Sequence, residues 1–234
     1  MEKAQKHLER LSKKELICDD HINHLKKLKK SGVEPKVIYD IGSCVLHWTR
    51  AAQKIWPDAK VYLFDAFTTA EFLYKDYEYH IGVLSDIDNK IVKFYQNDEF
   101  PTGNSYYKEI GHTKSAKNNA RILFNESHMT ERVAMTLDTV VNQKGFPKPD
   151  LVKIDVQGSE KDVVAGGKST LKNASHLIVE MQHAEYNKGA PLVTETLPFI
   201  EKTLDVVCTA PLFANNGPDG DYCFESKDWR SKCH

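Results

Sequence analysis

Four acidic residues stand at or near the ends of short apolar runs, and this recurrence is the part of the sequence best suited to chemistry. They are Asp40, Asp65, Asp155 and Glu180. The carboxyl ends of parallel strands share one edge of a sheet, where α/β domains bind their ligands. We therefore expect a rim of carboxylates there, which would repel a phosphate group and suit a cationic or amine-bearing ligand.

The first of these runs, residues 37–42, ends in Asp-Ile-Gly and predicts a buried strand that turns at once into a helix. Such a turn directs backbone N–H groups into the crevice above the strand ends. Gly42 would let the backbone approach a ligand closely. From this stretch alone an ordinary strand–helix turn is an equal alternative.

Asp65 follows Asp40 by 25 residues and ends the next apolar run. In a strand–helix–strand unit, an acid at that place lies beside the first turn and can accept hydrogen bonds from both hydroxyls of a ribose. The alternative is that Asp65 caps the helix that begins at Ala66.

Bulk composition indicates one globular domain of ordinary size. The chain has 234 residues, 41% hydrophobic and 28% charged, and a net charge of −1, so no overall field favours nucleic acid or an anionic membrane. The apolar runs are too short to span a membrane, and the N-terminus has no signal-peptide core. We expect a cytoplasmic protein. The five cysteines show no CxxC pair, which favours free thiols.

Hydrophobic periodicity predicts how the elements alternate. A helix over 2–30 precedes strands at 37–40, 59–65, 79–86, 90–95, 132–137, 151–154 and 176–180, with helices after several of them, notably at 46–56 and 194–204. Strands at 205–209 and 222–224 would form an edge hairpin, residues 108–130 a loop with a partial helix, and residues 229–234 a frayed end. This pattern predicts an α/β fold with a doubly wound, mostly parallel sheet and an antiparallel C-terminal edge.

Motifs spread over residues 35–225 resemble the FkbM family of S-adenosylmethionine-dependent methyltransferases. They include Asp40-Ile-Gly42, Phe64-Asp65, Gly82-Val-Leu-Ser-Asp86, Gly103-Asn-Ser105, Thr136-Leu-Asp138, Gly166-Gly167 and Ile178-Val-Glu180. The most specific is Lys153-Ile-Asp-Val-Gln-Gly-Ser-Glu160. The loops at 183–191 and 215–221 are similar to those of a subgroup with algal-virus and phage-like members, and for a viral chain the cytoplasm would be the host's.

The resemblance implies a Rossmann-like methyltransferase sheet, with residues 1–32 as an N-terminal helical extension and residues 33–234 as the domain that binds S-adenosylmethionine. It also implies methyl transfer to an oxygen, usually of a sugar or glycan. The expected cofactor contacts are Asp40, Gly42 and Ser43 at the amino-acid end, Asp65 with Ala66 at the ribose, and Val83 and Leu84 at the adenine. The family's first turn usually runs Asp-x-Gly-x-Asn-x-Gly. Here Cys44 and Leu46 replace the Asn and the second Gly, and we expect Leu46 to crowd the methionine part.

The candidates for a general base are Asp155, Glu180 and His183. Asp155 is nearest the expected methyl position, and an imidazole has the most suitable intrinsic pKa. Lys153 would polarise the acceptor or form an ion pair with a rim acid. Asn104, Ser105, Tyr186, Asn187, Asp219 and Asp221 lie on loops that could recognise sugar hydroxyls, although ordinary turn chemistry explains each one as well. The three base candidates could also hold a divalent metal, but their spacing does not require one and we expect none.

Two rival functions remain at this point. A nicotinamide-dependent dehydrogenase would require glycines at 44 and 47 as well as 42, and these are absent. A catalytically degenerate methyltransferase fold, kept as a binding module, would fit the altered first turn.

Overall fold

The structure, a computed structural model, describes residues 2–14, 16–110, 124–213 and 217–233. Seven strands form the central sheet in the order β3-β2-β1-β7-β8-β10-β9. Their bounds are β1 Val37–Ile41, β2 Lys60–Asp65, β3 Glu78–Ile81, β7 Leu151–Ile154, β8 His176–Gln182, β9 Val206–Phe213 and β10 Asp219–Ser226. The first five in spatial order are parallel, and β10 runs antiparallel to both β8 and β9. The predicted mostly parallel sheet with an antiparallel edge is confirmed.

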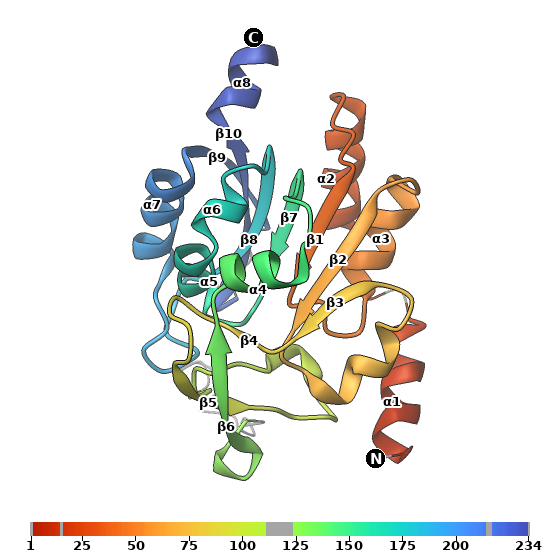
Figure 1. Ribbon diagram of the computed structural model, residues 1–234, viewed down its shortest axis with the longest axis vertical. Coiled ribbons are helices and arrows are strands. Elements are labelled where there is room, and N and C mark those ends of the chain that lie inside the picture. The colour runs from red at the N-terminus through yellow and green to blue at the C-terminus, as the bar shows by residue number, and fades with distance from the viewer. Residues whose placement is uncertain (1, 15, 111–123, 214–216, 234) are drawn as a thin grey trace.

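Helices cover both faces of this sheet (Figure 1). One face carries α1 (Glu2–Ser12), α2 (Asp19–Lys30) and α3 (His47–Ile55), and the other carries α4 (Leu137–Lys144), α5 (Glu160–Gly166), α6 (Lys168–Leu171) and α7 (Val193–Leu204). Each face buries its own apolar cluster. Ile38 of β1 packs with α2 and α3, and the next residue, Tyr39, packs with the opposite cluster. This alternation is the period of two expected for a strand that is buried on both sides.

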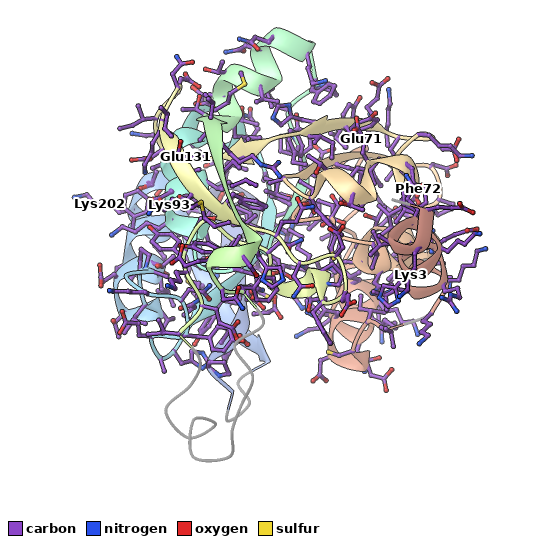
Figure 2. All side chains as sticks on the ribbon, turned by 90° about the horizontal axis from the view of Figure 1, so that it is seen from below. Lys3, Glu71, Phe72, Lys93, Glu131 and Lys202 are labelled. Carbon is purple, nitrogen blue, oxygen red and sulfur yellow. The ribbon has the colours of Figure 1, made fainter. Side chains whose placement is uncertain are left out.

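A small second sheet stands beside the carboxyl ends of the large one. It has the order β4-β6-β5, with β4 at Val83–Leu84, β5 at Ile91–Tyr95 and β6 at Met129–Met135. Val92 and Phe94 of β5 are buried, whereas Lys93 pairs with Glu131 across the strands on the exposed side (Figure 2). The short 3₁₀ helices η1 (Thr68–Leu73), η2 (Pro101–Gly103) and η4 (Glu126–His128) complete this region.

Several predicted boundaries are wrong. The single helix over 2–30 is two helices, because Asp19 and Asp20 begin a new helix where acidic side chains favour the N-terminal end of the dipole. The single strand over 79–86 divides at Gly82, so that β3 joins the large sheet and β4 the small one. The predicted strand over 132–137 ends earlier, because Thr136 caps α4 by accepting a hydrogen bond from the Thr139 N–H.

The C-terminal region is more ordered than predicted. Strand β10 begins at Asp219, inside the predicted loop, because it pairs with β8 as far as Gln182. Residues 227–233 form α8 (Lys227–Cys233) instead of a frayed end, and the ring of Trp229 lies 5.2 Å from that of His176. In the predicted loop over 108–130, residues 111–123 lie outside the described residues.

Candidate active site

The order of strands places a crevice at the carboxyl ends of β1 and β7. The chain proceeds from β1 outward to β2 and β3 on one side, and from β7 to β8 on the other, so the two strands flank the topological switch point of the sheet. Open α/β sheets bind ligands at this point. Two adjoining cavities lie there, of about 670 and 930 Å³ with their open mouths included. Gly42, Cys44, Thr102 and Asp155 line both of them.

The β1–α3 turn depends on Gly42. Its φ is +87°, and a Cβ atom there would lie 1.7 Å from the carbonyl oxygen of Asp155. The N–H of Asp155 in turn donates to the Ile41 carbonyl at 2.9 Å. The close approach that this glycine permits is therefore to the backbone that follows β7, which brings the first turn and Asp155 together.

Cys44 and Leu46 both adopt left-handed backbone conformations, with φ of 46° and 70°. Asn and Gly, which stand at these places in the pattern that the sequence resembles, adopt this conformation more easily than Cys and Leu. The side chain of Leu46 is buried in the core beneath α1–α3 and lines neither cavity. The expected crowding of the cofactor by Leu46 is therefore not observed.

Asp65, at the end of β2, lines the first cavity. Its Oδ2 accepts from the Cys44 N–H at 2.6 Å, and its Oδ1 accepts from the Phe67 N–H at 2.7 Å. Burial raises the pKa of Asp65, although these two backbone bonds lower it in part. The carboxylate thus fixes the first turn and the chain after β2, and each oxygen retains a lone pair for a ligand.

The rest of the first cavity is mainly apolar. The predicted contacts Ala66, Val83 and Leu84 line it, together with Phe64 and Phe94, which were not predicted as cofactor contacts. Two predicted acceptor-binding residues, Asn104 and Ser105, also lie here and not in the second cavity.

Asn104 and Ser105 differ in what they can offer a ligand. The Oδ1 of Asn104 accepts from the Asn97 N–H at 2.8 Å, but its buried Nδ2 has no hydrogen-bond partner among the described residues. The Ser105 hydroxyl already donates to the Gln157 carbonyl and accepts from the Tyr107 N–H. Asn104 therefore has an unused donor, and Ser105 holds two loops together.

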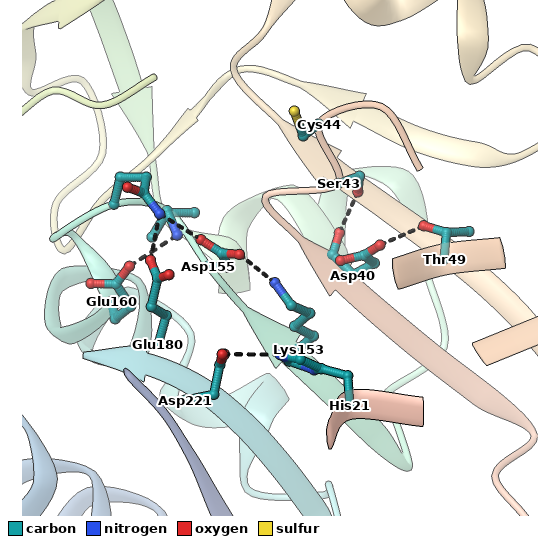
Figure 3. Close-up of polar contacts among 12 residues, drawn as sticks. His21, Asp40, Ser43, Cys44, Thr49, Lys153, Asp155, Glu160, Glu180 and Asp221 are labelled. Carbon is teal, nitrogen blue, oxygen red and sulfur yellow. Dashed lines mark hydrogen bonds and ion pairs between the residues drawn. The ribbon is translucent and has the colours of Figure 1, made fainter. Parts of the chain in front are cut away.

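Strand register gathers charged side chains at the second cavity, which Lys153, Glu180 and Asp221 line and beneath which Asp40 is buried. Asp40 lies opposite Lys153 on neighbouring strands, and Glu180 lies opposite Asp221. All four are on the sheet face that carries α1–α3. The Lys153 Nζ donates to Asp155 Oδ2 at 2.6 Å (Figure 3). Burial lowers the pKa of Lys153, but the charges of Asp155, Asp221 and Asp40 raise it well above its ordinary range. The ion pair considered for Lys153 is present.

The pKa values of Asp155 and Glu180 shift in opposite directions. Burial raises the pKa of Asp155, but the Lys153 ammonium and hydrogen bonds from Glu180, Lys153 and Gln157 more than offset this, and the pKa falls to about 2. Burial and the charge of Asp155 raise the pKa of Glu180 well above its ordinary range. The Gln157 amide donates to both carboxyl groups. These directions favour an ionised Asp155 beside a protonated Glu180 at neutral pH.

Asp40 and Ser43 are structural neighbours within the first turn. Asp40 is 1% exposed and lines neither cavity, and its Oδ2 accepts from the Thr49 hydroxyl. Burial raises its pKa to about 6, although Lys153 and Thr49 oppose the shift. The Ser43 hydroxyl donates to the Asp40 carbonyl at 2.7 Å, and Ser43 lines the second cavity.

Three predicted residues lie away from both cavities. His183 Nε2 is 2.8 Å from the Tyr222 hydroxyl, on the sheet face opposite Asp221. The Tyr186 hydroxyl donates to Glu109 Oε1 at 2.6 Å, and the Asn187 amide donates to the Tyr107 carbonyl at 3.0 Å. These contacts brace the loops, and their roles toward an acceptor remain predictions. Asp219 and Asp221 do line the second cavity.

The second cavity also contains N-terminal residues that sequence reasoning missed. Leu16, Ile17, Cys18 and His21 line it, with His47 and Trp48 of α3. His21 Nε2 lies 3.0 Å from Asp221 Oδ2 (Figure 3). The signal that could have found them is the short apolar run over 16–18, directly before the acidic start of α2.

Comparison with known proteins identifies the family of this chain. The sequence model of the methyltransferase FkbM domain family matches residues 37–207. This chain belongs to the FkbM methyltransferase family. A 68-residue segment is 38% identical to the 2-O-methyltransferase NoeI of Sinorhizobium fredii, covering 28% of each chain, so the match spans far less than the whole relative.

Solved methyltransferases align with the FkbM chain at low identity. The O-methyltransferase TomG of Streptomyces achromogenes, in complex with SAM, has 11% identity and a TM-score of 0.47, with 96% of this chain and 88% of that one covered. The precorrin-6y C5,15-methyltransferase of Geobacter metallireducens has 13% identity and a TM-score of 0.44, with 88% and 87% covered.

S-adenosylmethionine is the cofactor of this methyltransferase, and the first cavity fits it. The apolar wall suits an adenine, and Asp65 offers lone pairs to ribose hydroxyls. The Asn104 Nδ2, which has no partner among the described residues, offers a donor. The ionised Asp155, at the junction of the cavities, suits a positively charged group. When bound, the cofactor supplies a methyl group activated by a sulfonium.

Neither a metal cluster nor a membrane helix is found in the described part of the chain. No group of three His, Cys, Asp or Glu side chains there is arranged to hold a metal ion. None of the described helices combines the length and the apolar character needed to cross a bilayer.

Proposed function

We propose that this FkbM methyltransferase transfers the methyl group of S-adenosylmethionine to a hydroxyl oxygen of a sugar or glycan. The observation that carries the proposal is the pair of cavities that meet at Gly42, Cys44 and Asp155. The first suits a nucleoside and the second is lined by polar side chains, so donor and acceptor can approach each other at their junction.

The lining of the second cavity favours a neutral, hydroxyl-rich acceptor. Lys153 and the buried Trp48 indole N–H are donors, and the indole has no partner among the described residues. Asp219 and Asp221 add acceptors. A hydroxyl both donates and accepts, so a sugar can satisfy such a mixture, whereas the acidic excess opposes an anionic acceptor. The similarity to a 2-O-methyltransferase supports transfer to oxygen.

The residues at the junction would act mainly by positioning. Well-oriented reactants reach effective molarities of about 10⁵–10⁸ M, so much of the rate can come from alignment alone. Asp155 is held by Lys153 and Gln157 in one orientation. Its pKa of about 2 makes it a weak base but a constant hydrogen-bond acceptor for the reacting hydroxyl. The protonated Glu180 would donate its hydrogen bond to Asp155 and so help to hold that carboxylate in place.

A labelled-methyl transfer assay tests the proposal. Methyl-labelled S-adenosylmethionine is incubated with a panel of monosaccharides and oligosaccharides, with phenol and amine acceptors as controls, and products are located by mass spectrometry. We expect labelled O-methyl sugar. Transfer only to phenols or amines would refute the sugar assignment, and binding of S-adenosylhomocysteine without any transfer would favour a binding module. Thermal stabilisation by S-adenosylhomocysteine but not by NAD would exclude the dehydrogenase.

A further inference from the structure

His21 and Asp221 form a buried pair on the wall of the second cavity, and both lie outside the segment that matches the family, residues 37–207. His21 belongs to α2 and Asp221 to β10, so two ends of the chain meet here. Their side chains are 11% and 15% exposed, and His21 Nε2 lies 3.0 Å from Asp221 Oδ2. The family's shared segment therefore does not itself supply this pair.

The contact fixes the tautomer of the His21 ring. An ionised carboxylate can only accept a hydrogen bond, so Nε2 must carry the proton that it donates to Asp221. In the neutral ring the lone pair is then on Nδ1. That atom is buried and has no hydrogen-bond partner among the residues that the structure describes. A buried polar atom without a partner destabilises a fold, and a bound hydroxyl would supply that partner.

The earlier candidates are less suited to removing a proton. Asp155 holds its proton weakly, Glu180 is already protonated, and His183 is bonded to Tyr222 away from both cavities. We propose that His21, oriented by Asp221, is the general base that accepts the proton of the acceptor hydroxyl. This inference rests on the proposed O-methyl transfer.

The step balances without any other reactant. The hydroxyl oxygen forms the new O–C bond while the C–S bond breaks and its electron pair goes to sulfur. The hydroxyl proton goes to His21 Nδ1, and the imidazolium, stabilised by Asp221, later releases it to water. The charged groups near His21 are Asp221 and Asp219 of β10, Lys153 of β7, and His24 and His47 of the helices. His21 must be uncharged to accept this proton.

Three variants test the role. H21Q should lower kcat about 10²–10⁴-fold, the usual contribution of a general base, with the Kd for S-adenosylhomocysteine unchanged. The residual kcat of H21Q should no longer fall on the acid side of the pH profile. D221N should also lower kcat, because a carboxamide can donate to Nε2 and move the ring proton to Nδ1. H24Q is the matched control, since His24 lies one turn further along α2 beside Cys223.

Nitrogen NMR of the labelled imidazole gives a readout that does not depend on activity. In the wild-type chain Nε2 should be protonated and Nδ1 unprotonated at neutral pH, and D221N should reverse them. A protonated Nδ1 in the wild type would overturn the inference, as would an H21Q variant with unchanged kcat or with only a raised KM. If the wild-type chain methylates no hydroxyl at all, both the proposed function and the role of His21 are refuted. If the wild-type chain is active and H21Q has the same kcat, only the role of His21 is refuted.

Discussion

A comparison of two nucleosides on the wild-type chain and on D65N should separate the ribose contact of Asp65 from its structural bonds, of which an Asn side chain can keep only one. The carboxylate already accepts from the backbone N–H groups of Cys44 and Phe67 at 2.6 and 2.7 Å. Two ribose hydroxyls would use its remaining lone pairs, and a hydrogen bond to a charged group contributes about 1.5–3 kcal/mol. Loss of even one such bond weakens binding about tenfold or more, because 1.4 kcal/mol is a factor of ten.

The assay is a cycle of two proteins and two nucleosides by calorimetry. Wild-type chain should bind adenosine at least about tenfold more tightly than 2′,3′-dideoxyadenosine, which lacks both hydroxyls. In D65N this preference should fall to about twofold or less, because an amide accepts less strongly and presents a donor on one side. The absolute affinity for S-adenosylhomocysteine should fall at least about tenfold.

Thr49→Val is the matched control for damage to the turn. The Thr49 hydroxyl of α3 donates to Asp40 Oδ2 of β1 and so holds the two sides of the turn together, and Thr49 lines neither cavity. Its loss should weaken both nucleosides equally and leave their ratio as in the wild type. If D65N kept the wild-type preference for adenosine, the assignment of Asp65 to the ribose would be refuted.

Three further changes test the geometry around the first turn. D155N should lower turnover at least about tenfold while the Kd for S-adenosylhomocysteine changes less than about threefold, because Lys153 loses the anion that orients it. G42A should destabilise the fold by about 2–5 kcal/mol in chemical denaturation, since its Cβ would collide with the Asp155 carbonyl and its φ is strained. D40N should stabilise the chain by up to about 3 kcal/mol above pH 6 and by little below pH 4, as followed by denaturation at each pH.

The sign of the last prediction follows from burial. The folded pKa of Asp40, about 6, lies above the ordinary value of 3.8, so the stabilising contribution of this carboxyl group is complete below pH 3.8. It is lost as the pH rises through 6, where the buried group ionises. An equal D40N effect at pH 4 and pH 7 would contradict this account. Wild-type stability in G42A, or wild-type turnover in D155N, would remove the roles given to those residues.

The large sheet was predictable because its strands are short apolar runs that end close to acids. The positions of Asp65 and Asp155 at the crevice follow from that pattern and from the shared edge of parallel strands. Asp40 and Glu180 were placed less well, since both lie inside strands and point to the face beneath α1–α3. Only the pairing register shows that Asp40 is opposite Lys153 and has its carboxylate buried.

Contacts between distant segments were beyond the sequence. In the sequence, His21 is one polar residue on a predicted helix that is rich in lysines. Its contact with Asp221 joins positions 200 residues apart, so the local pattern does not indicate it. Leu46 was expected at the cofactor because its place in the turn is a glycine in related patterns. Its left-handed backbone turns the side chain into the core instead. Tertiary packing determines both the His21–Asp221 contact and the direction of the Leu46 side chain, and neither can be predicted from local sequence periodicity.

The most direct test of the account is a crystal structure of the chain with S-adenosylhomocysteine. The account predicts the adenosine in the first cavity, with the ribose hydroxyls on Asp65 and the sulfur directed toward the junction at Asp155. The product bound elsewhere, or Asp65 turned away from the ribose, would contradict it.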